Sequence, residues 1–422
     1  MVGANRLYLD NAATSFPKPP GVAEAVARFL RDSGGSAGRG AYREAREAGE
    51  IVAKCRRALT NLVGAPSADH VVFSLNCTDA LNLAIRGVLE PVLMREQEAH
   101  LITTDMDHNS VLRPTRALEE RWGGRLRVTR LDADPTTGAI DPADLRAALS
   151  PSTRLVAISH ASNIAGTIQP IRAMGALCRE AGVPFLVDAA QSMGHVPIDF
   201  EADAIDLLAF PGHKGLLGPL GTGGLIMRPG MERIIATVRE GGTGSRSEHD
   251  AHPTDLPDKY EPGSHNLPGI AGLLAAVQWI AHQTVASIRA HEIELIEAFF
   301  GALRAEDGAM PAGLRILGPT DARHRIGVIS VTIDGMPPSR VSDVLEDRFS
   351  VLTRSGLHCA PRAHRTFGTD PESAPAGCSG ATRFSFGPFV TVDQARFAGD
   401  SLRTITREHA ESAIGAAASN AG

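Results

Sequence analysis

Residues 184–191 read Pro-Phe-Leu-Val-Asp-Ala-Ala-Gln, and residues 207–215 read Leu-Leu-Ala-Phe-Pro-Gly-His-Lys-Gly. Each segment begins with a short apolar run without polar alternation, which predicts a strand buried on both faces. The first run ends at an acid, Asp188, and the second is followed by a lysine, Lys214. Ligands of parallel sheets bind at the carboxyl ends of the strands, so both side chains are expected at a ligand site.

A lysine and a carboxylate in this relation are what pyridoxal 5'-phosphate (PLP) requires. The lysine amine forms a Schiff base with the cofactor aldehyde, and the carboxylate keeps the pyridine nitrogen protonated, so that the ring accepts electrons. A surface lysine and a strand-end aspartate are each common alone. Whether Asp188 and Lys214 indicate a PLP site therefore depends on the other motifs of the chain.

Composition excludes several classes of protein. The 422 residues suffice for two or three domains, and 43% hydrophobic and 21% charged residues are ordinary for a globular protein. The net charge of −6 argues against a nucleic-acid-binding surface. The sequence has neither an apolar run of membrane-spanning length nor a leader pattern at its start, so we expect neither membrane insertion nor secretion. The odd number of cysteines without metal-ligand spacing predicts free thiols, no metal site and a cytoplasmic protein; they are Cys55, Cys77, Cys178, Cys359 and Cys378.

Short apolar runs alternate with helical patterns through the middle of the chain. This alternation predicts an α/β fold with a mostly parallel, seven-stranded sheet covered on both faces. Besides the two runs above, the candidate strands are 71–74, 100–103, 125–129, 155–159 and 224–227.

The pattern changes near residue 266. A long helical stretch (267–306), two candidate strands (326–331 and 381–386) and a terminal helix (392–410) predict a smaller α+β domain. We therefore expect a large cofactor-binding domain over 15–265 and a small domain made of 1–14 and 266–414. The small, polar tail 415–422 is expected to be disordered. Segment 241–266, rich in Gly, Pro and Ser, is too long for an ordinary connection and is expected to be functional or partly mobile.

Further polar residues follow the candidate strands and are expected to converge with Asp188. Thr78, in Asn-Cys-Thr-Asp-Ala (76–80), opens a helix whose N-terminus would bind a phosphate, although a plain helix cap explains the same residues. His108 and Asn163 follow two other strands. A histidine at this place can stack on a pyridine ring and move protons, whereas a lone loop histidine is more often exposed.

Two features lie in the expected small domain. Cys359, in Arg-Ser-Gly-Leu-His-Cys-Ala-Pro (354–361), stands beside His358 and five residues after Arg354 on a loop marked by Gly and Pro. This electropositive setting favours the nucleophilic thiolate over a buried inert cysteine. Arg383 lies inside an apolar run, where it needs a partner, either a substrate carboxylate or a structural ion pair.

With these motifs the chain resembles the class V aminotransferase family of fold-type I PLP enzymes. It is most similar to the cysteine desulfurase and selenocysteine lyase group with a short, ordered cysteine loop. The resemblance runs from Tyr8 to about Thr391. It rests on motifs that occur in family order: 9–14, 159–163, 187–191, 212–214 and 354–359.

The resemblance implies a role for each matching residue. Lys214 would be the Schiff-base lysine, Asp188 the partner of the pyridine nitrogen, Gln191 the partner of the ring hydroxyl and His108 the stacked ring. The remaining implied roles are phosphate or cofactor binding (Thr78, Cys77, His213, Asn163), phosphate binding from the neighbouring subunit of a homodimer (Ser264), substrate binding (Arg383, Asn163, Arg354, Ala13) and sulfur acceptance (Cys359).

Two positions depart from the family pattern. Pro211 stands where a Ser or Thr usually binds the phosphate, and Cys77 stands where a small or hydroxyl residue is usual. We expect a PLP site that forms with fewer phosphate donors.

The implied activity is conversion of L-cysteine to L-alanine, with the sulfur held as a persulfide on Cys359 for an acceptor protein. Alternatives are a selenocysteine lyase acting on L-selenocysteine, another PLP-dependent lyase or transaminase, or a PLP-binding scaffold without turnover. Cys378, on a Gly-rich stretch, is either a sulfur relay or an ordinary loop thiol.

Overall fold

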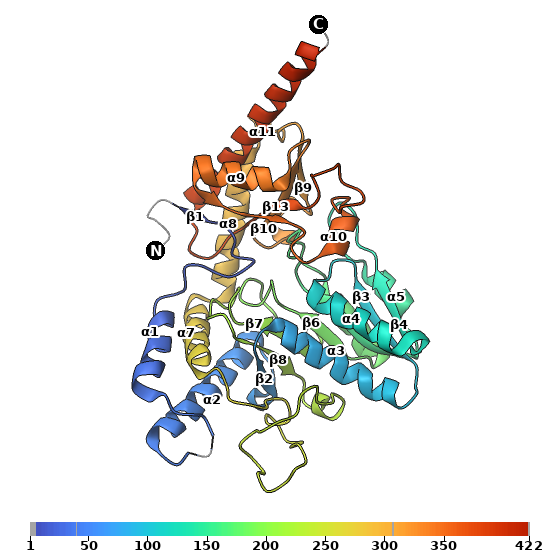
Figure 1. Cartoon of the computed structure of the whole chain (residues 1–422), viewed down its shortest axis with the longest axis vertical. Coiled ribbons are helices and arrows are strands. Elements are labelled where there is room, and N and C mark those ends of the chain that lie inside the picture. The colour runs from blue at the N-terminus through green and yellow to red at the C-terminus, as the bar shows by residue number, and fades with distance from the viewer. Residues whose placement is uncertain (1–5, 39, 306–307, 421–422) are drawn as a thin grey trace.

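The computed structural model describes residues 6–38, 40–305 and 308–420, with side chains described up to residue 413 (Figure 1). Its largest element is a seven-stranded sheet with the strand order β2-β8-β7-β6-β5-β3-β4. Neighbouring strands from β7 to β4 are parallel, and β8 runs antiparallel to both β7 and β2. The strands are β2 (Val71–Ser74), β3 (Ala99–Thr104), β4 (Leu126–Leu131), β5 (Thr153–Ser159), β6 (Phe185–Asp188), β7 (Leu207–Pro211) and β8 (Gly223–Met227). The predicted fold class, a mostly parallel sheet of seven strands, is confirmed.

Helices cover both faces of this sheet. Alternate residues of one strand enter different cores: Phe185 and Val187 pack on one face, and Leu186 packs on the other. This explains why the strands are apolar throughout instead of alternating. The helices of this part are α1 (Val22–Arg28), α2 (Arg43–Val63), α3 (Cys77–Met94), α4 (Asn109–Trp122), α5 (Pro142–Ala148), α6 (Ile171–Ala181) and α7 (Leu267–Gln283).

A second unit lies at the carboxyl side of the large sheet, where α9, β10 and β13 stand above β6 and β7 in Figure 1. Its antiparallel sheet has the order β12-β13-β10-β9, and a separate parallel pair joins β1 near the N-terminus to β11. The strands are β1 (Leu7–Tyr8), β9 (Leu314–Leu317), β10 (Val328–Ile333), β11 (Val351–Leu352), β12 (Arg354–Gly356) and β13 (Ala381–Ser385). The helices are α8 (Val285–Leu303), α9 (Pro338–Phe349), α10 (Pro361–Thr366) and α11 (Val392–Asn420).

Packing refines the expected domain limits. Helix α7 contacts α1 and α2, and its apolar residues belong to the core beneath the large sheet. The expected division at residue 266 stays a prediction, but packing associates α7 with the large sheet. The expected disorder of the tail from residue 415 stays a prediction. Helix α11 continues to Asn420, as its Ala-rich sequence favours. Residues 421 and 422 lie outside the described residues.

Within the described part of the chain, no helix combines the length and apolar character that a membrane span requires.

Candidate active site

Eight of the residues to which the sequence assigned a site role line one pocket of about 540 Å³ beside the carboxyl ends of β6 and β7. They are Cys77, Thr78, His108, Asn163, Asp188, Gln191, His213 and Lys214. The expected convergence of strand-end residues is therefore observed. Ser264, Arg354, Cys359, Arg383 and Ala13 do not line this pocket.

Lys214 and Asp188 are brought together because β6 and β7 are parallel neighbours, with Asp188 opposite Ala209. The Asp188 carboxyl accepts a hydrogen bond from the Ala190 amide at 2.9 Å and one from the Cys77 thiol at 3.5 Å. Burial raises the pKa of Asp188, and the Lys214 charge opposes that shift. Burial lowers the pKa of Lys214, again opposed by Asp188. The two groups thus form an acid–base pair in a desolvated pocket.

A second carboxyl group lies behind Asp188. Asp107, directly before His108, accepts hydrogen bonds from the amides of Thr104 (2.6 Å) and Ser159 (3.0 Å). The Ser159 side chain also interacts with both Asp107 and Asp188. Burial raises the pKa of Asp107 to about 7. Sequence reasoning missed this residue, although its place beside His108 after β3 was a signal.

His108 caps helix α4 and is half-buried, so it is not the exposed loop histidine of the alternative interpretation. Its Nδ1 accepts a hydrogen bond from the Ser110 amide at 3.1 Å, so in the neutral ring the proton resides on Nε2. The Ser110 hydroxyl lies 2.9 Å from that Nδ1 and 2.8 Å from the Thr78 hydroxyl. Burial, and then the Lys214 charge, lower the pKa of His108 to about 4. The ring is therefore neutral at pH 7.

The N-terminus of a helix and a half-buried histidine make part of the pocket suitable for an anion. The N-terminus of α3 opens here, and Asn76 caps it by accepting the Asp79 amide at 3.0 Å. The plain helix cap is thus present, and the helix end also faces the pocket. Nδ1 of His213 is buried without a hydrogen-bond partner among the described residues, and burial lowers the pKa of His213 to about 4. Pro211 adds no hydroxyl here. Exposed Ser264 lies in a different pocket, of about 690 Å³.

The peptide bond that precedes Lys214 is held by the N-terminal segment. The His213 carbonyl accepts hydrogen bonds from the Ser15 amide (3.0 Å), the Ser15 hydroxyl (3.0 Å), the Thr14 hydroxyl (3.2 Å) and the Lys18 amine (3.2 Å). Burial lowers the pKa of Lys18 to about 8. Thr14 belongs to the motif 9–14, but nothing in the sequence indicated this contact, because the His213 carbonyl lies almost 200 positions away.

Arg383 projects from β13 and is buried. Its Nη2 is 2.9 Å from Oδ1 of Asp10, and its Nη1 donates to the Asn163 carbonyl at 3.2 Å. Its Nε has no partner among the described residues. The geometry is thus compatible with both expected partners of Arg383. The structural ion pair exists, and Nε remains available as a donor to a substrate carboxylate.

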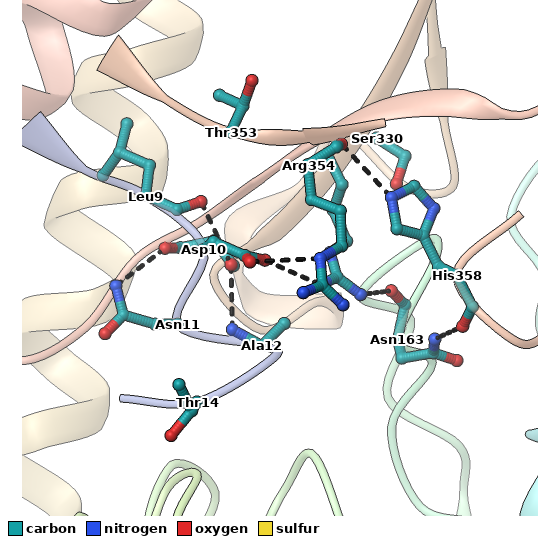
Figure 2. A network of polar contacts seen from close by, with 12 residues as sticks. Leu9, Asp10, Asn11, Ala12, Thr14, Asn163, Ser330, Thr353, Arg354 and His358 are labelled. Carbon is teal, nitrogen blue, oxygen red and sulfur yellow. Dashed lines mark hydrogen bonds and ion pairs between the residues drawn. The ribbon is translucent and has the colours of Figure 1, made fainter. Parts of the chain in front are cut away.

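Arg354 begins β12 and is exposed, with its Nε 3.1 Å from Oδ2 of Asp10 (Figure 2). Close by, the Gln191 amide donates to the Ala12 carbonyl at 3.0 Å. Ala13 is half-buried, and its own amide donates to the Asp10 carbonyl. The segment around Asp10 therefore joins the pocket to the second unit.

Cys359 is exposed on the loop between β12 and α10. His358 and Cys359 both adopt left-handed backbone conformations, with φ of 49° and 60°, which non-glycine residues rarely do. Two hydrogen bonds hold the loop: the Asn163 side chain donates to the His358 carbonyl at 2.7 Å (Figure 2), and the Asn109 amide donates to the Cys359 carbonyl at 2.8 Å. Residues beside the pocket thus anchor the thiol-bearing turn.

The expected electropositive setting of Cys359 needs correction. Burial, and then the Arg383 charge, lower the pKa of His358 to about 3, so this ring is neutral at pH 7. Arg354 in turn is paired with Asp10. The positive charge beside the thiol is therefore smaller than the sequence suggested.

Comparison with known proteins gives one consistent picture. Residues 7–396 match the family model described as aminotransferase class-V. A "probable cysteine desulfurase" of Methanothermobacter thermautotrophicus is 30% identical over 95% of each chain. A "probable cysteine desulfurase 2" of Mycobacterium leprae is 32% identical over 96% of this chain and 93% of its own. The apo structure of a cysteine desulfurase from Thermococcus onnurineus superposes with a TM-score of 0.85 at 27% identity, covering 96% of this chain and 95% of that one.

Proposed function

Because the chain belongs to the aminotransferase class-V family, we propose that it is a PLP-dependent cysteine desulfurase. It converts L-cysteine to L-alanine and keeps the sulfur as a persulfide on Cys359. The names of its relatives support this activity. The geometry that carries the proposal is the anchoring of Cys359: Asn163, which lines the pocket of Lys214 and Asp188, holds the turn that bears the thiol.

The residues of the pocket fit PLP. Asp188 offers a buried carboxylate for the pyridine nitrogen, and His108 presents a neutral ring for stacking. The unpartnered Nδ1 of His213 and the N-terminus of α3 suit the phosphate. Lys214 would hold the cofactor covalently.

PLP, when bound, supplies an electron sink for the charge left on the substrate when its Cα proton is removed. Lys214 takes that proton, since burial lowers the pKa of its amine and so makes the neutral base accessible. Asp188 keeps the pyridine nitrogen protonated. The Ser159 hydroxyl interacts with that carboxyl and helps to hold it in position.

The substrate carboxylate binds Arg383. Its Nε is a buried donor without a hydrogen-bond partner in the described part of the chain. Asp10 and the Asn163 carbonyl hold the other guanidinium nitrogens. Asn163 thereby contacts both the carboxylate-binding arginine and the cysteine loop. Arg354 and Ala13 complete the substrate side of the site.

Cys359 takes the sulfur as a thiolate. A bond forms between the Cys359 sulfur and the substrate sulfur while the carbon–sulfur bond breaks, and the electron pair of that bond stays with the substrate carbon, which takes up a proton. L-cysteine and one thiol thus give L-alanine and one persulfide, so no external oxidant is required. The exposure of Cys359 lets an acceptor protein then take the sulfur.

Two further features belong to this proposal. The enzyme is a homodimer in which Ser264 contacts the phosphate bound by the neighbouring subunit. Ser264 is exposed and therefore available for that contact. The enzyme works in the cytoplasm, in line with its free cysteines.

The test is incubation of the purified protein with L-cysteine and a thiol reductant, followed by quantification of alanine and sulfide. We expect equal amounts of both products, and we expect Cys359→Ser to abolish them while the absorption of bound PLP is retained. Formation of pyruvate instead of alanine, or wild-type rates in Cys359→Ser, would refute the proposal.

A further inference from the structure

A single carboxylate joins the two arginines of the substrate side. Oδ1 of Asp10 lies 2.9 Å from Nη2 of Arg383, and Oδ2 lies 3.1 Å from Nε of Arg354. The Arg383 side chain is 3% exposed and that of Asp10 is 16% exposed, whereas Arg354 is more than half exposed. Asp10 therefore shields one side of the arginine that we assign to the substrate carboxylate.

Asp10 is fixed by the backbone around it. Residue 10 forms a bridge with Ser385 of β13, and the Ser385 amide donates to the Leu9 carbonyl at 2.7 Å. The Asn11 side chain donates to the Ser385 carbonyl at 3.0 Å, and the Tyr8 hydroxyl donates to the Asp10 carbonyl at 3.1 Å. The backbone at Asp10 thus pairs with the strand that carries Arg383. This pairing positions the Asp10 carboxylate beside the guanidinium.

The side chains around Arg383 carry a small net charge. Arg383 and Arg354 each contribute one positive charge, and Asp10 cancels one of them. Lys214, whose charge also acts on both arginines, is offset by the neighbouring Asp188. The two neighbouring rings add none, because the pKa of His108 is lowered to about 4 and that of His358 to about 3. The substrate therefore meets one net positive charge here, which a single α-carboxylate neutralises.

We propose that Asp10 determines the charge selectivity of the site. By cancelling one arginine, it adapts the site to amino acids with a neutral side chain and disfavours those whose side chain carries a second anionic group. L-cysteine meets this requirement, since its thiol has a pKa of about 8.5 and is therefore mostly protonated at pH 7. The inference rests on the proposed function for the assignment of Arg383 to the substrate carboxylate.

The experiment uses the PLP-loaded enzyme and two ligands of equal carbon number. L-2-aminobutyrate has a neutral side chain, and L-aspartate carries a second carboxylate. Dissociation constants are measured by titration of the cofactor absorbance and, independently, by calorimetry. For the wild type we expect tighter binding of L-2-aminobutyrate. In Asp10→Asn, which keeps the shape and removes the charge, we expect the ratio of the two constants to shift by about tenfold or more towards L-aspartate.

A second variant separates charge from shape. Asp10→Asn combined with Arg354→Gln returns the net charge to one positive unit without restoring the carboxylate. If charge governs selectivity, the double variant regains the preference for L-2-aminobutyrate. A ratio that stays at the wild-type value in Asp10→Asn, or one that the double variant fails to restore, would overturn the inference.

The outcome is distinguishable from failure of the proposed function. The selectivity ratio comes from binding and requires no sulfur transfer, so it can fail while the wild type still converts L-cysteine to alanine. Conversely, absence of alanine in the wild type refutes the desulfurase and leaves the ratio to be measured. Thermal unfolding of each variant confirms that only folded proteins are compared.

Discussion

The side-chain amide of Asn163 donates a hydrogen bond of 2.7 Å to the carbonyl of His358, the residue that precedes the exposed thiol. One side chain therefore lines the pocket of Lys214 and Asp188 and also fixes a turn with left-handed backbone conformations more than 190 positions away. This contact makes the position of the thiol depend on the integrity of the pocket.

Asn163→Asp should loosen that turn, because a carboxylate has the same shape but cannot donate to a carbonyl. We expect the rate of alanine formation to fall by about tenfold to a hundredfold, as displacement of a reacting group by about 1 Å does. Hydrogen exchange of the amides in 356–360 should become faster in the same variant. Unchanged exchange with a lowered rate would mean that Asn163 acts on the substrate alone.

Cys77 should contribute to cofactor retention through Asp188. Its thiol donates to the Asp188 carboxyl at 3.5 Å and so opposes the burial that raises the pKa of Asp188. Cys77→Val removes the donor at similar volume, and we expect PLP to dissociate about three- to tenfold faster. Cys77→Ser keeps a donor and serves as the control. Equal dissociation rates in the Val and Ser variants would exclude this role.

Pro211→Ser should strengthen PLP binding. The serine supplies the hydroxyl that the part of the pocket suited to an anion lacks, and a hydrogen bond to a charged phosphate corresponds to about a tenfold gain in affinity. Equilibrium dialysis after removal of the cofactor measures the effect. Pro211→Ala separates loss of the proline ring from gain of the hydroxyl. If the Ser and Ala variants bind PLP equally, the missing hydroxyl has no influence.

Acid should destabilise the fold through its buried histidines. Burial lowers the pKa values of these histidines from 6.5 to about 4 or below. Between pH 6.5 and pH 4 the unfolded chain therefore binds protons that the folded chain does not bind. The histidines are His100, His108, His160, His213, His358 and His364. Stability must therefore fall as the pH drops through this window. The buried carboxyl groups with raised pKa values act in the opposite direction; they are Asp107, with a pKa of about 7, Asp188 and Asp105.

Calorimetry in buffers of different ionisation enthalpy tests this expectation. Near pH 5 we expect net proton uptake on unfolding, and the uptake should be smaller in His160→Gln. Net proton release near pH 5 would contradict the assignment of neutral histidines.

The large sheet and its pocket are predictable from sequence because their signals are local. The run that ends at Asp188 and the one that precedes Lys214 each identify a strand and its ligand-side residue. The same logic found Thr78 and His108. Strands of two or three residues, such as β1, β11 and β12, carry too little pattern to be recognised.

Asp10 and Lys18 escaped prediction for a different reason. Their roles depend on partners far along the chain: Asp10 meets Arg383, and Lys18 meets the His213 carbonyl. The neutrality of His358 also follows only from its burial in the folded chain, so charge counted along the loop overestimated the positive field at Cys359.

The pairing of β1 with β11, and of Asp10 with Arg383, has a consequence for synthesis of the protein on the ribosome. The N-terminal segment with β1 and Asp10 is synthesised first, but its partners β11 and Arg383 are synthesised late. The strands of the large sheet, in contrast, are all present by residue 227. Because domains fold as units during translation, the pocket of Lys214 and Asp188 can take shape on a nascent chain that still lacks the second unit. A prematurely terminated product would thus retain much of the large sheet while lacking both Arg383 and Cys359.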